Sequence, residues 1–373
     1  MNGTRTGILI LTLVAIAAAI FYLQSQNPTP RASTAHADLV RTQQSPGAAD
    51  RTEKAKMFPR AKEIVDPSGF VNTDGIRIKD LIGKKVILVD FWTYSCINCQ
   101  RTTPYLNDWY TKYKDKGLEI IGVHTPEFEF EKSRDNVARA VEKFGIKYPV
   151  VMDNDYATWR AYGNQYWPRE YLIDIDGYIV HDHIGEGGYD ETELKIQDLL
   201  TERMATLGEA GAVNTPLSAP VDATNVTGPV SPETYFGAGR NEYLGNGTPF
   251  KIGPQTLSAP TTPKQDLLYL VGAWRFEDEY ATSAQAGNKI IYRYQGKNVY
   301  LVATDPVGAV IHVTRDGKPL GSAAGADVGA DGTVRIKESR LYELVEDPAG
   351  YGEHELEIQI DAPGIQFYTF TFG

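Results

Sequence analysis

Residues 86–100 read VILVDFWTYSCINCQ, and this stretch decides the fold of the first half of the chain. Its apolar, β-branched beginning predicts a short buried strand, and the helical pattern that follows places Cys96 and Cys99 at a strand-to-helix junction. A thiol at the start of a helix meets unpaired backbone N–H groups and the positive end of the helix dipole, which favour its thiolate. We therefore expect Cys96 to be the nucleophile, and Cys99 to attack the mixed disulfide that Cys96 forms with a substrate.

The cysteine count limits the chemistry of the site. The chain has 373 residues and two cysteines, both in this C-x-x-C motif, so no second pair is present to complete a structural zinc site. His181 and His183 alternate on one predicted strand, but no third metal ligand accompanies them, and we interpret them as solvated hairpin residues. We therefore expect no metal, and no cofactor other than a redox-active disulfide between Cys96 and Cys99.

Overall charge excludes one class of partner. The sequence contains 48 acidic and 37 basic residues, which gives a net charge of −11. Proteins that bind nucleic acids usually carry an excess of basic residues, because the phosphate backbone is negatively charged. We therefore expect no nucleic-acid partner.

Two further positions are candidates for the site because of their place in predicted strands. Asp90 lies inside the apolar strand, where burial should raise the pKa of its carboxyl group. Beneath the cysteines it would accept the proton of Cys99, whereas the alternative is a strand-end carboxylate that is capped or paired with a lysine. Trp92 is expected to pack beside the site, and an ordinary core tryptophan is the alternative.

A proline before a later strand is expected to form the second wall of the site. Pro168 precedes the apolar stretch 170–175; it lacks an N–H donor, and a cis form would leave neighbouring backbone groups free to pair with an extended peptide. An ordinary loop proline is an equally good interpretation. We expect Trp167, Tyr94 and Ser95 to contact the substrate.

The N-terminal part of the sequence predicts export and membrane attachment. Residues 1–23 contain an uninterrupted apolar run after Arg5, which we interpret as an uncleaved signal anchor, a transmembrane helix; a cleaved signal peptide is the alternative. Residues 24–61 are rich in Pro, Ser, Thr, Ala and charge, and predict a flexible tether. Positive charge before the helix predicts a single-pass protein of the cell membrane whose catalytic domain lies on the periplasmic or cell-envelope side.

Two folded domains are expected after the tether. Strands alternate with helices over residues 62–207, which predicts an α/β domain, and Asp176-Gly177 marks a hairpin turn. Residues 208–230, rich in small and turn-forming residues, are expected to be a linker. Short alternating strands over residues 231–373 predict an antiparallel β-sandwich of jelly-roll type. Its aromatic side chains would fill a core or, as the alternative, include a stacking platform for a sugar.

The cysteine motif also carries a resemblance to a known family. Asp90, Trp92 and the C-x-x-C, followed by Pro168 and the Leu-Ile-Asp sequence at 172–174, resemble the thioredoxin superfamily. An additional strand and helix between residues 118 and 151 resemble its extracytoplasmic TlpA-like branch. The resemblance implies that Cys96 attacks, that Cys99 resolves the mixed disulfide, that Asp90 handles protons and that Pro168 is cis.

A narrower resemblance covers both predicted domains. Residues 91–106 (FWTYSCINCQRTTPYL), 231–240 (SPETYFGAGR) and 365–373 (IQFYTFTFG) resemble the exported region of DipZ-type proteins, in which a thioredoxin-like domain precedes a β-sandwich similar to carbohydrate-binding modules. This resemblance implies a thiol-disulfide oxidoreductase that reduces protein disulfides. Because one anchor helix is expected here, electrons would come from a separate membrane partner of the CcdA or DsbD kind. The alternative is an envelope protein that binds cell-wall glycan or peptide, with a thioredoxin-like half that is a redox sensor or scaffold.

Overall fold

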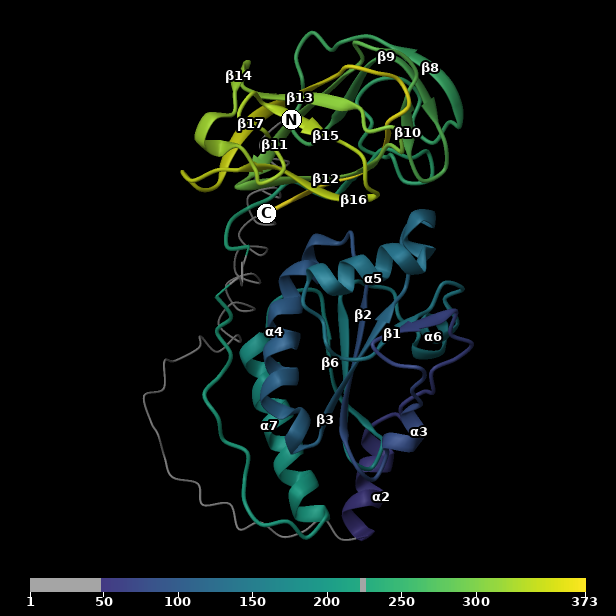
Figure 1. Cartoon of the computed structure of the whole chain (residues 1–373), viewed down its shortest axis with the longest axis vertical. Coiled ribbons are helices and arrows are strands. Elements are labelled where there is room, and N and C mark those ends of the chain that lie inside the picture. Colours follow the sequence, from purple (N-terminus) through teal and green to yellow (C-terminus); the bar gives the residue numbers. More distant parts are fainter. Residues whose placement is uncertain (1–47, 222–225) are drawn as a thin grey trace, which may run out of the picture. The chain divides into compact units, whose positions relative to one another are not determined.

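The computed structural model describes residues 48–221 and 226–373 (Figure 1). The membrane anchor predicted at residues 1–23, and the predicted tether as far as residue 47, lie outside the described residues. None of the helices in the described part of the chain combines the length and the apolar character that crossing a membrane requires.

The end of the predicted tether is folded. Helix α2 (Ala48–Met57) places the Lys54 ammonium 2.8 Å from Asp174 Oδ2, and Lys54 also pairs with Glu202. After the helix, the Ile179 N–H donates to the carbonyl oxygen of Pro59 at 2.9 Å. The prediction of a flexible tether over residues 24–61 is therefore wrong for residues 48–61, because these ion pairs and backbone hydrogen bonds fix them to the rest of the domain.

Six strands in the first half of the described chain form one mixed sheet in the order β1-β4-β3-β2-β5-β6. Strands β2, β3 and β4 are parallel, and the remaining neighbours are antiparallel. The hairpin predicted across Asp176-Gly177 is confirmed between β5 and β6. The strands are β1 (Gly69–Val71), β2 (Val86–Trp92), β3 (Leu118–His124), β4 (Val150–Met152), β5 (Arg169–Ile173) and β6 (Ile179–Ile184).

Helices cover both faces of this sheet (Figure 1). Alternate residues of β2 point to opposite faces, so Leu88 and Trp92 pack with side chains of α4, α5 and α7, whereas Val89 and Phe91 face α3 and α6. All seven residues of β2 are buried, as expected for a central strand. The helices are α3 (Ile78–Leu81), α4 (Ile97–Tyr113), α5 (Arg134–Lys143), α6 (Ala157–Tyr162) and α7 (Tyr189–Thr206), with 3-10 turns η1 (Lys114–Lys116) and η2 (Glu129–Lys132).

The predicted linker is partly bound to this first domain. Val213 is buried in the same core cluster as α7, and the Ser218 N–H donates to Glu193 Oε2 at 2.6 Å. The Thr215 hydroxyl lies 2.8 Å from the hydroxyl of Tyr113 on α4. The first half of residues 208–230 therefore packs along α4 and α7.

The second half of the chain forms a large antiparallel β-sheet region, in agreement with the predicted all-β domain. Its described strands form one sheet in the order β14-β13-β17-β11-β9-β10-β18-β12-β16, with β7, β8 and β15 attached at its sides. The strands are β7 (Thr234–Tyr235), β8 (Gly253–Leu257), β9 (Leu268–Phe276), β10 (Ala281–Ser283), β11 (Lys289–Gly296), β12 (Asn298–Thr304), β13 (Val310–Arg315), β14 (Lys318–Pro319), β15 (Thr333–Arg335), β16 (Arg340–Glu346), β17 (Gly352–Ile360) and β18 (Gln366–Phe372), with the 3-10 turn η3 (Gly321–Ala323).

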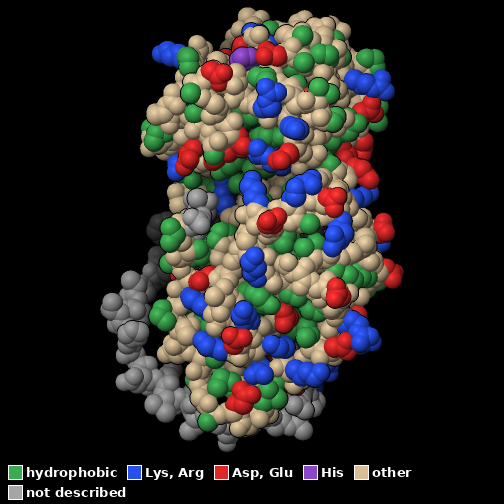
Figure 2. All heavy atoms as spheres, viewed as in Figure 1, with side chains coloured by type: hydrophobic (Ala, Val, Ile, Leu, Met, Phe, Trp, Pro, Cys, Tyr) green, Lys and Arg blue, Asp and Glu red, His purple; other side chains and the backbone are tan. Residues whose placement is uncertain are grey.

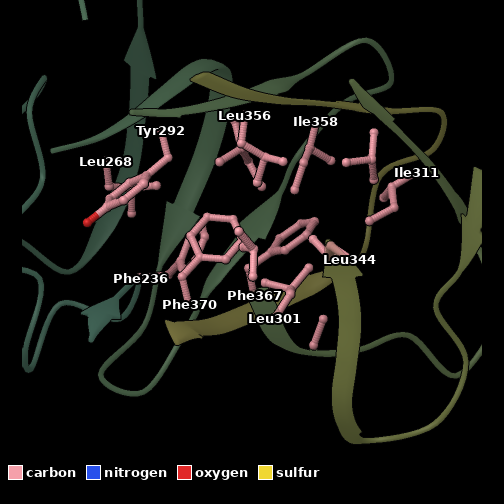
Figure 3. Close-up of a cluster of buried hydrophobic side chains, with 14 of the residues drawn as sticks. Phe236, Leu268, Tyr292, Leu301, Ile311, Leu344, Leu356, Ile358, Phe367 and Phe370 are labelled. Carbon is pink, nitrogen blue, oxygen red and sulfur yellow. The ribbon is translucent and has the colours of Figure 1, made fainter. Parts of the chain in front are cut away.

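Strand β9 takes part in both layers of this β-sheet region. Residues 268–271 of β9 pair with β11, whereas residues 272–276 pair with β8 and β10. The change of partner falls at Gly272, whose φ of +99° favours glycine and where a Cβ atom would lie 2.0 Å from Asn288 Oδ1. Side chains from the two layers, including Leu301 and Ile358, meet in the core (Figure 3). The jelly-roll connection of the strands stays a prediction.

Charged side chains of both signs are interspersed over the face of the molecule in Figure 2, and neither sign gathers into one patch on that face.

Candidate active site at Cys96 and Cys99

Cys96 and Cys99 lie where the sequence predicts, at the junction between β2 and α4. Cys96 is the N-cap residue of α4, with extended backbone angles, and its sulfur accepts a hydrogen bond from the Cys99 N–H at 3.3 Å. Cys96 is partly exposed, whereas Cys99 is buried, and both thiols are free. A substrate disulfide can therefore reach Cys96 only, and the helix N-terminus stabilises negative charge on its sulfur.

The second thiol is held in its protonated form. Burial raises the pKa of the Cys99 thiol well above its usual range, and the hydrogen bond and charge of Cys96 add to this effect. The negative charge of Asp90 raises it further, while the backbone of Thr93 acts in the opposite direction. Cys99 therefore needs a proton acceptor before it can attack a mixed disulfide.

Asp90 is placed to be that acceptor. It lies in β2 on the face covered by α4, and its side chain is 2% exposed. Burial raises the pKa of its carboxyl group to about 8, and its Oδ1 atom has no hydrogen-bond partner among the described residues. No lysine or arginine within residues 53–221 or 226–373 forms an ion pair with it, so the alternative of a lysine-paired carboxylate at a strand end does not describe Asp90.

The cis-proline that the family resemblance implies is present, whereas its role as the second wall of the site stays a prediction. The peptide bond between Trp167 and Pro168 is cis, and β5 begins directly after it. The Trp167 indole N–H donates to the carbonyl oxygen of Thr125 at 3.1 Å, and its ring packs against Trp159 with centroids 4.3 Å apart. The Pro168 carbonyl oxygen accepts a hydrogen bond from the Gly185 N–H at 2.9 Å.

An open pocket of about 610 Å³ surrounds the exposed thiol. Cys96, Asn98 and Trp167 line it from the first half of the described chain, and residues of the second half line it from the other side. The sandwich residues were not predicted, because sequence patterns within one domain contain no information on which loop of a second domain lies beside a motif. They include Ser231, Glu233, Tyr235, Arg240, Thr371 and Phe372.

Charged groups in this pocket compensate one another. The Arg240 guanidinium lies 2.7 Å from Glu127 Oε1, and the Tyr235 hydroxyl donates to the same oxygen at 2.9 Å. The wall of the pocket therefore contains a carboxylate whose charge is compensated by a guanidinium group.

Tyr94 and Ser95 do not line this pocket. The Tyr94 hydroxyl donates to the carbonyl oxygen of Ser339 at 3.0 Å, and the Ser95 hydroxyl donates to Glu131 Oε1 at 2.5 Å. Both side chains are buried. The prediction that they contact substrate is therefore corrected to a structural role, because their hydroxyl groups are used inside the protein. Trp92 is buried as expected and meets His124 edge to face with ring centroids 5.1 Å apart.

An aromatic cluster joins the two halves of the described chain beside the site. Phe128 meets Tyr368 with ring centroids 4.9 Å apart, and the Arg101 guanidinium lies 5.5 Å from the centre of the Tyr300 ring. Tyr300 and Tyr368 are thus buried between the halves, while other aromatic residues of the sandwich fill its core, namely Trp274, Phe276, Tyr292 and Tyr294. The burial of these residues agrees with the interpretation that they fill a core, rather than with the alternative that they form a stacking platform for a sugar.

Glu170 is a buried titratable residue that the sequence reasoning missed. It is 3% exposed, lies directly opposite Asp90 in the pairing of β2 with β5, and its Oε2 atom has no hydrogen-bond partner in the described part of the chain. Burial, together with the charge of Asp90, raises the pKa of the Glu170 carboxyl well above its usual range. The sequence did contain a signal, because Glu170, like Asp90, is an acidic residue next to buried apolar residues of the same strand.

A C-x-x-C at the start of a helix, in a domain whose mixed sheet has a cis-proline directly before a strand, is typical of the thioredoxin-like class of proteins. Residues 62–200 match the Redoxin family, and residues 231–373 match the family described as thioredoxin like C-terminal domain. Thiol-disulfide oxidoreductase ResA of Bacillus anthracis is 38% identical over 128 residues, which are 33% of this chain and 70% of ResA. The chain therefore belongs to the thioredoxin-like family of thiol-disulfide oxidoreductases.

A second relative matches both halves. Protein DipZ of Mycobacterium tuberculosis (strain CDC 1551 / Oshkosh) is 37% identical over 334 residues, which are 88% of this chain and 44% of DipZ. The resemblance to DipZ-type proteins that the sequence motifs indicate is thus confirmed. The chain spans less than half the length of this relative.

Proposed function

We propose that this chain reduces disulfide bonds in protein substrates by thiol-disulfide exchange at Cys96 and Cys99. The observation that carries the proposal is that the two thiols differ in their exposure and in their surroundings. Cys96 is partly exposed at a helix N-terminus, while Cys99 is buried and protonated near Asp90. One thiol is thus built to attack a substrate and the other to resolve the product of that attack.

The reaction follows from this geometry. The Cys96 thiolate attacks one sulfur of the substrate disulfide, the substrate S–S bond breaks, and one substrate sulfur leaves as a thiolate. Asp90 then takes the proton of Cys99, and the Cys99 thiolate attacks the Cys96 sulfur of the mixed disulfide. The second substrate sulfur leaves as a thiolate, and the two electrons that reduced the substrate come from the Cys96–Cys99 dithiol, which becomes a disulfide.

The open pocket supports a protein substrate rather than a small thiol alone. Its volume of about 610 Å³ and its lining from both halves of the chain provide room for an extended peptide segment beside Cys96. The sandwich would then contribute to substrate binding. Binding of cell-wall glycan by the sandwich stays a prediction.

A complete cycle needs a reductant for the Cys96–Cys99 disulfide. We place this chain on the extracytoplasmic side of a membrane, attached by the apolar segment in residues 1–23, and receiving electrons from a membrane partner of the CcdA or DsbD kind. The apolar run after Arg5 and the resemblance to DipZ-type proteins support this placement.

Insulin reduction tests the proposed reaction. Wild-type protein supplied with a reductant should reduce insulin disulfides, and Cys96→Ser should abolish the activity because the attacking sulfur is lost. Cys99→Ser should accumulate mixed disulfides that are visible on non-reducing gels. Titration of the Cys96–Cys99 dithiol against glutathione gives its reduction potential, which shows whether the protein reduces or oxidises its substrates. A strongly reducing potential agrees with a reductase, and a potential near those of oxidising catalysts would contradict it.

A further inference from the structure

Three titratable side chains lie in a row across β2, β5 and β6. In the antiparallel pairings of these strands, Asp90 is directly opposite Glu170, and Glu170 is directly opposite His183. Residues directly opposite each other project from the same face of a sheet, with Cβ atoms about 5 Å apart. The row is on the face that α4 and α7 cover, because Leu88 and Leu172, two residues away on the same strands, belong to that core cluster.

Each member of the row has a buried polar atom without a hydrogen-bond partner among the described residues. These atoms are Asp90 Oδ1, Glu170 Oε2 and His183 Nε2. Buried polar atoms are nearly always hydrogen-bonded in folded proteins, so three neighbouring exceptions require an explanation. Two ionised carboxylates cannot satisfy each other, whereas a carboxyl group that keeps its proton can donate to the next group in the row.

The row has one end at the active site and the other at solvent. At the inner end, the charge of Asp90 acts on the Cys99 thiol. At the outer end, β6 is the last strand of the sheet, and the half-buried His183 ring lies so close to Gly188 that a Cβ atom there would be 2.7 Å from its Cε1 atom. Gly188 lines an open pocket of about 500 Å³ together with Glu186, Asp190 and Glu191.

We propose that Glu170 and His183 form a proton relay that carries the proton released by Cys99 from Asp90 to solvent at the edge of the sheet. The relay rests on the proposed function. Glu170 gives its proton to His183 Nε2 and receives one from Asp90, and the His183 imidazolium then releases a proton to the open pocket. Asp90 is again a carboxylate and Glu170 is again protonated, so the row carries the same charge as before Cys99 released its proton. The same steps in reverse supply a proton when the disulfide is reduced.

The electrostatic surroundings favour such a relay. Burial raises the pKa of both carboxyl groups, and each carboxylate would oppose ionisation of the other, so the pair retains at least one proton near neutral pH. Tyr148 and Tyr189 also face Glu170, and the pKa of each phenol is raised by burial, so neither provides a positive counter-charge.

Other titratable and charged side chains near the row are His181, Arg169 and Asp182. Next to His183 on the same face, His181 lies opposite Leu172 and its ring is 3.4 Å from the Thr192 hydroxyl. Arg169 and Asp182 pair with each other and project from the opposite face of the sheet. Within the described residues no lysine or arginine is ion-paired with Asp90 or Glu170. A proton held by the row is therefore the positive charge that compensates its buried carboxylates.

Charge-neutral substitutions test the relay, with His181→Asn as the matched control. Reduced full-length protein is mixed with a small aromatic disulfide in a stopped-flow instrument, and the rate at which Cys99 resolves the mixed disulfide is followed from pH 5 to 10. General acid–base groups contribute roughly 10²- to 10⁴-fold, so losing one relay step should slow resolution by about tenfold or more at pH 7. We expect this loss in Glu170→Gln and in His183→Asn, with recovery above pH 9, where hydroxide removes the proton, and no change in His181→Asn.

Chemical rescue separates a relay from a packing effect. Added imidazole should restore His183→Ala, because the partly exposed His183 packs against Gly188, which lines the open pocket, and should not restore Glu170→Gln in the core; Glu170→Asp should recover part of the rate. Wild-type rates and pH profiles in both Glu170→Gln and His183→Asn would overturn the relay. If Glu170→Gln does not fold, the His183 variants decide the question alone. Failure of the proposed function gives a different result, namely a wild-type protein that reduces neither insulin nor the small disulfide.

Discussion

Asp90 and Glu170 face each other directly across β2 and β5, and each has a carboxyl oxygen without a hydrogen-bond partner in the part of the chain that the structure describes. Two unpaired acidic side chains in a core reduce stability, since burial of an ionised carboxylate is costly. A fold selected for stability alone would place apolar side chains here. The pair therefore lowers stability, which is the cost expected if it has the proposed role in proton transfer beneath Cys99.

The first prediction concerns the stability of Asp90→Asn as a function of pH. The pKa of Asp90 is raised to about 8 in the folded protein, so between about pH 4 and pH 8 the folded state binds a proton that the unfolded state has lost. Stability contributed by the protonated group is therefore present below pH 4 and lost as pH rises to 8. Because one pKa unit corresponds to about 1.4 kcal/mol, Asp90→Asn should raise the free energy of unfolding at pH 8 by up to several kcal/mol.

Urea unfolding at pH 4.5 and pH 8 provides the measurement for this variant. The difference between Asp90→Asn and wild type should be small at the lower pH and large at the higher one. The exposed Asp115 on η1 offers a control, and Asp115→Asn should change stability by less than about 0.5 kcal/mol at either pH. A stabilisation of Asp90→Asn that does not depend on pH would show that Asp90 is not the titrating group.

Local sequence patterns predicted the centre of this protein well. The strand that ends near Trp92, the helix start at Cys96, the hairpin at Asp176-Gly177 and the buried Asp90 all depend on residues close together in the chain. Periodicity, turn chemistry and the cost of burying a charge are therefore sufficient to find them.

Long-range features were not predictable in the same way. Glu170 meets Asp90 through the register of two strands, and Tyr94 is buried because it reaches Ser339 in the other half of the chain. The folded segment at residues 48–61 depends on the pairing of Lys54 with Asp174, which is 120 residues away. None of these partners can be identified from the composition of the segment concerned.

The second prediction is a difference in reactivity between the two thiols. Cys96 is partly exposed, whereas Cys99 is buried and the pKa of its thiol is raised by burial and by Cys96. Iodoacetamide at pH 7 should modify Cys96 and leave Cys99 unmodified in the folded, reduced protein. Peptide mass spectrometry detects the modified site, and labelling in urea shows that both residues can react. Equal labelling of both cysteines in the folded protein would contradict the assignment of roles.

The third prediction concerns Gly122, which pairs with Asp90 from the other side of β2. A Cβ atom at Gly122 would lie 2.9 Å from Trp92 Nε1 and 3.1 Å from Tyr148 Cε2. Gly122→Ala should therefore displace Trp92, lower the free energy of unfolding by about 1–3 kcal/mol and slow resolution by Cys99. Gly75→Ala, where a Cβ atom would meet nothing within 4 Å, is the matched control. Unchanged tryptophan fluorescence and unchanged activity in Gly122→Ala would show that the indole position is not needed.

The fourth prediction tests whether the sandwich takes part in substrate binding. Arg240 pairs with Glu127 at 2.7 Å and lies 3.7 Å from the centre of the Tyr235 ring, so it fixes the wall of the pocket beside Cys96. Arg240→Ala should raise KM for a protein disulfide severalfold and leave the rate with a small aromatic disulfide unchanged, because the two cysteines are not altered. The exposed Arg275, which pairs with Glu277, provides the control variant Arg275→Ala.

Steady-state insulin reduction and single-turnover reduction of the small disulfide separate the two effects of Arg240→Ala. If the sandwich only packs against the thioredoxin-like half, Arg240→Ala should lower thermal stability and leave both KM and the small-disulfide rate at wild-type values. If it binds substrate, KM for insulin rises while the melting temperature changes little, since a partly exposed ion pair contributes about 1 kcal/mol or less. A parallel loss of activity toward both substrates would instead place the effect at Cys96 itself, and would contradict a separate binding role for the pocket wall.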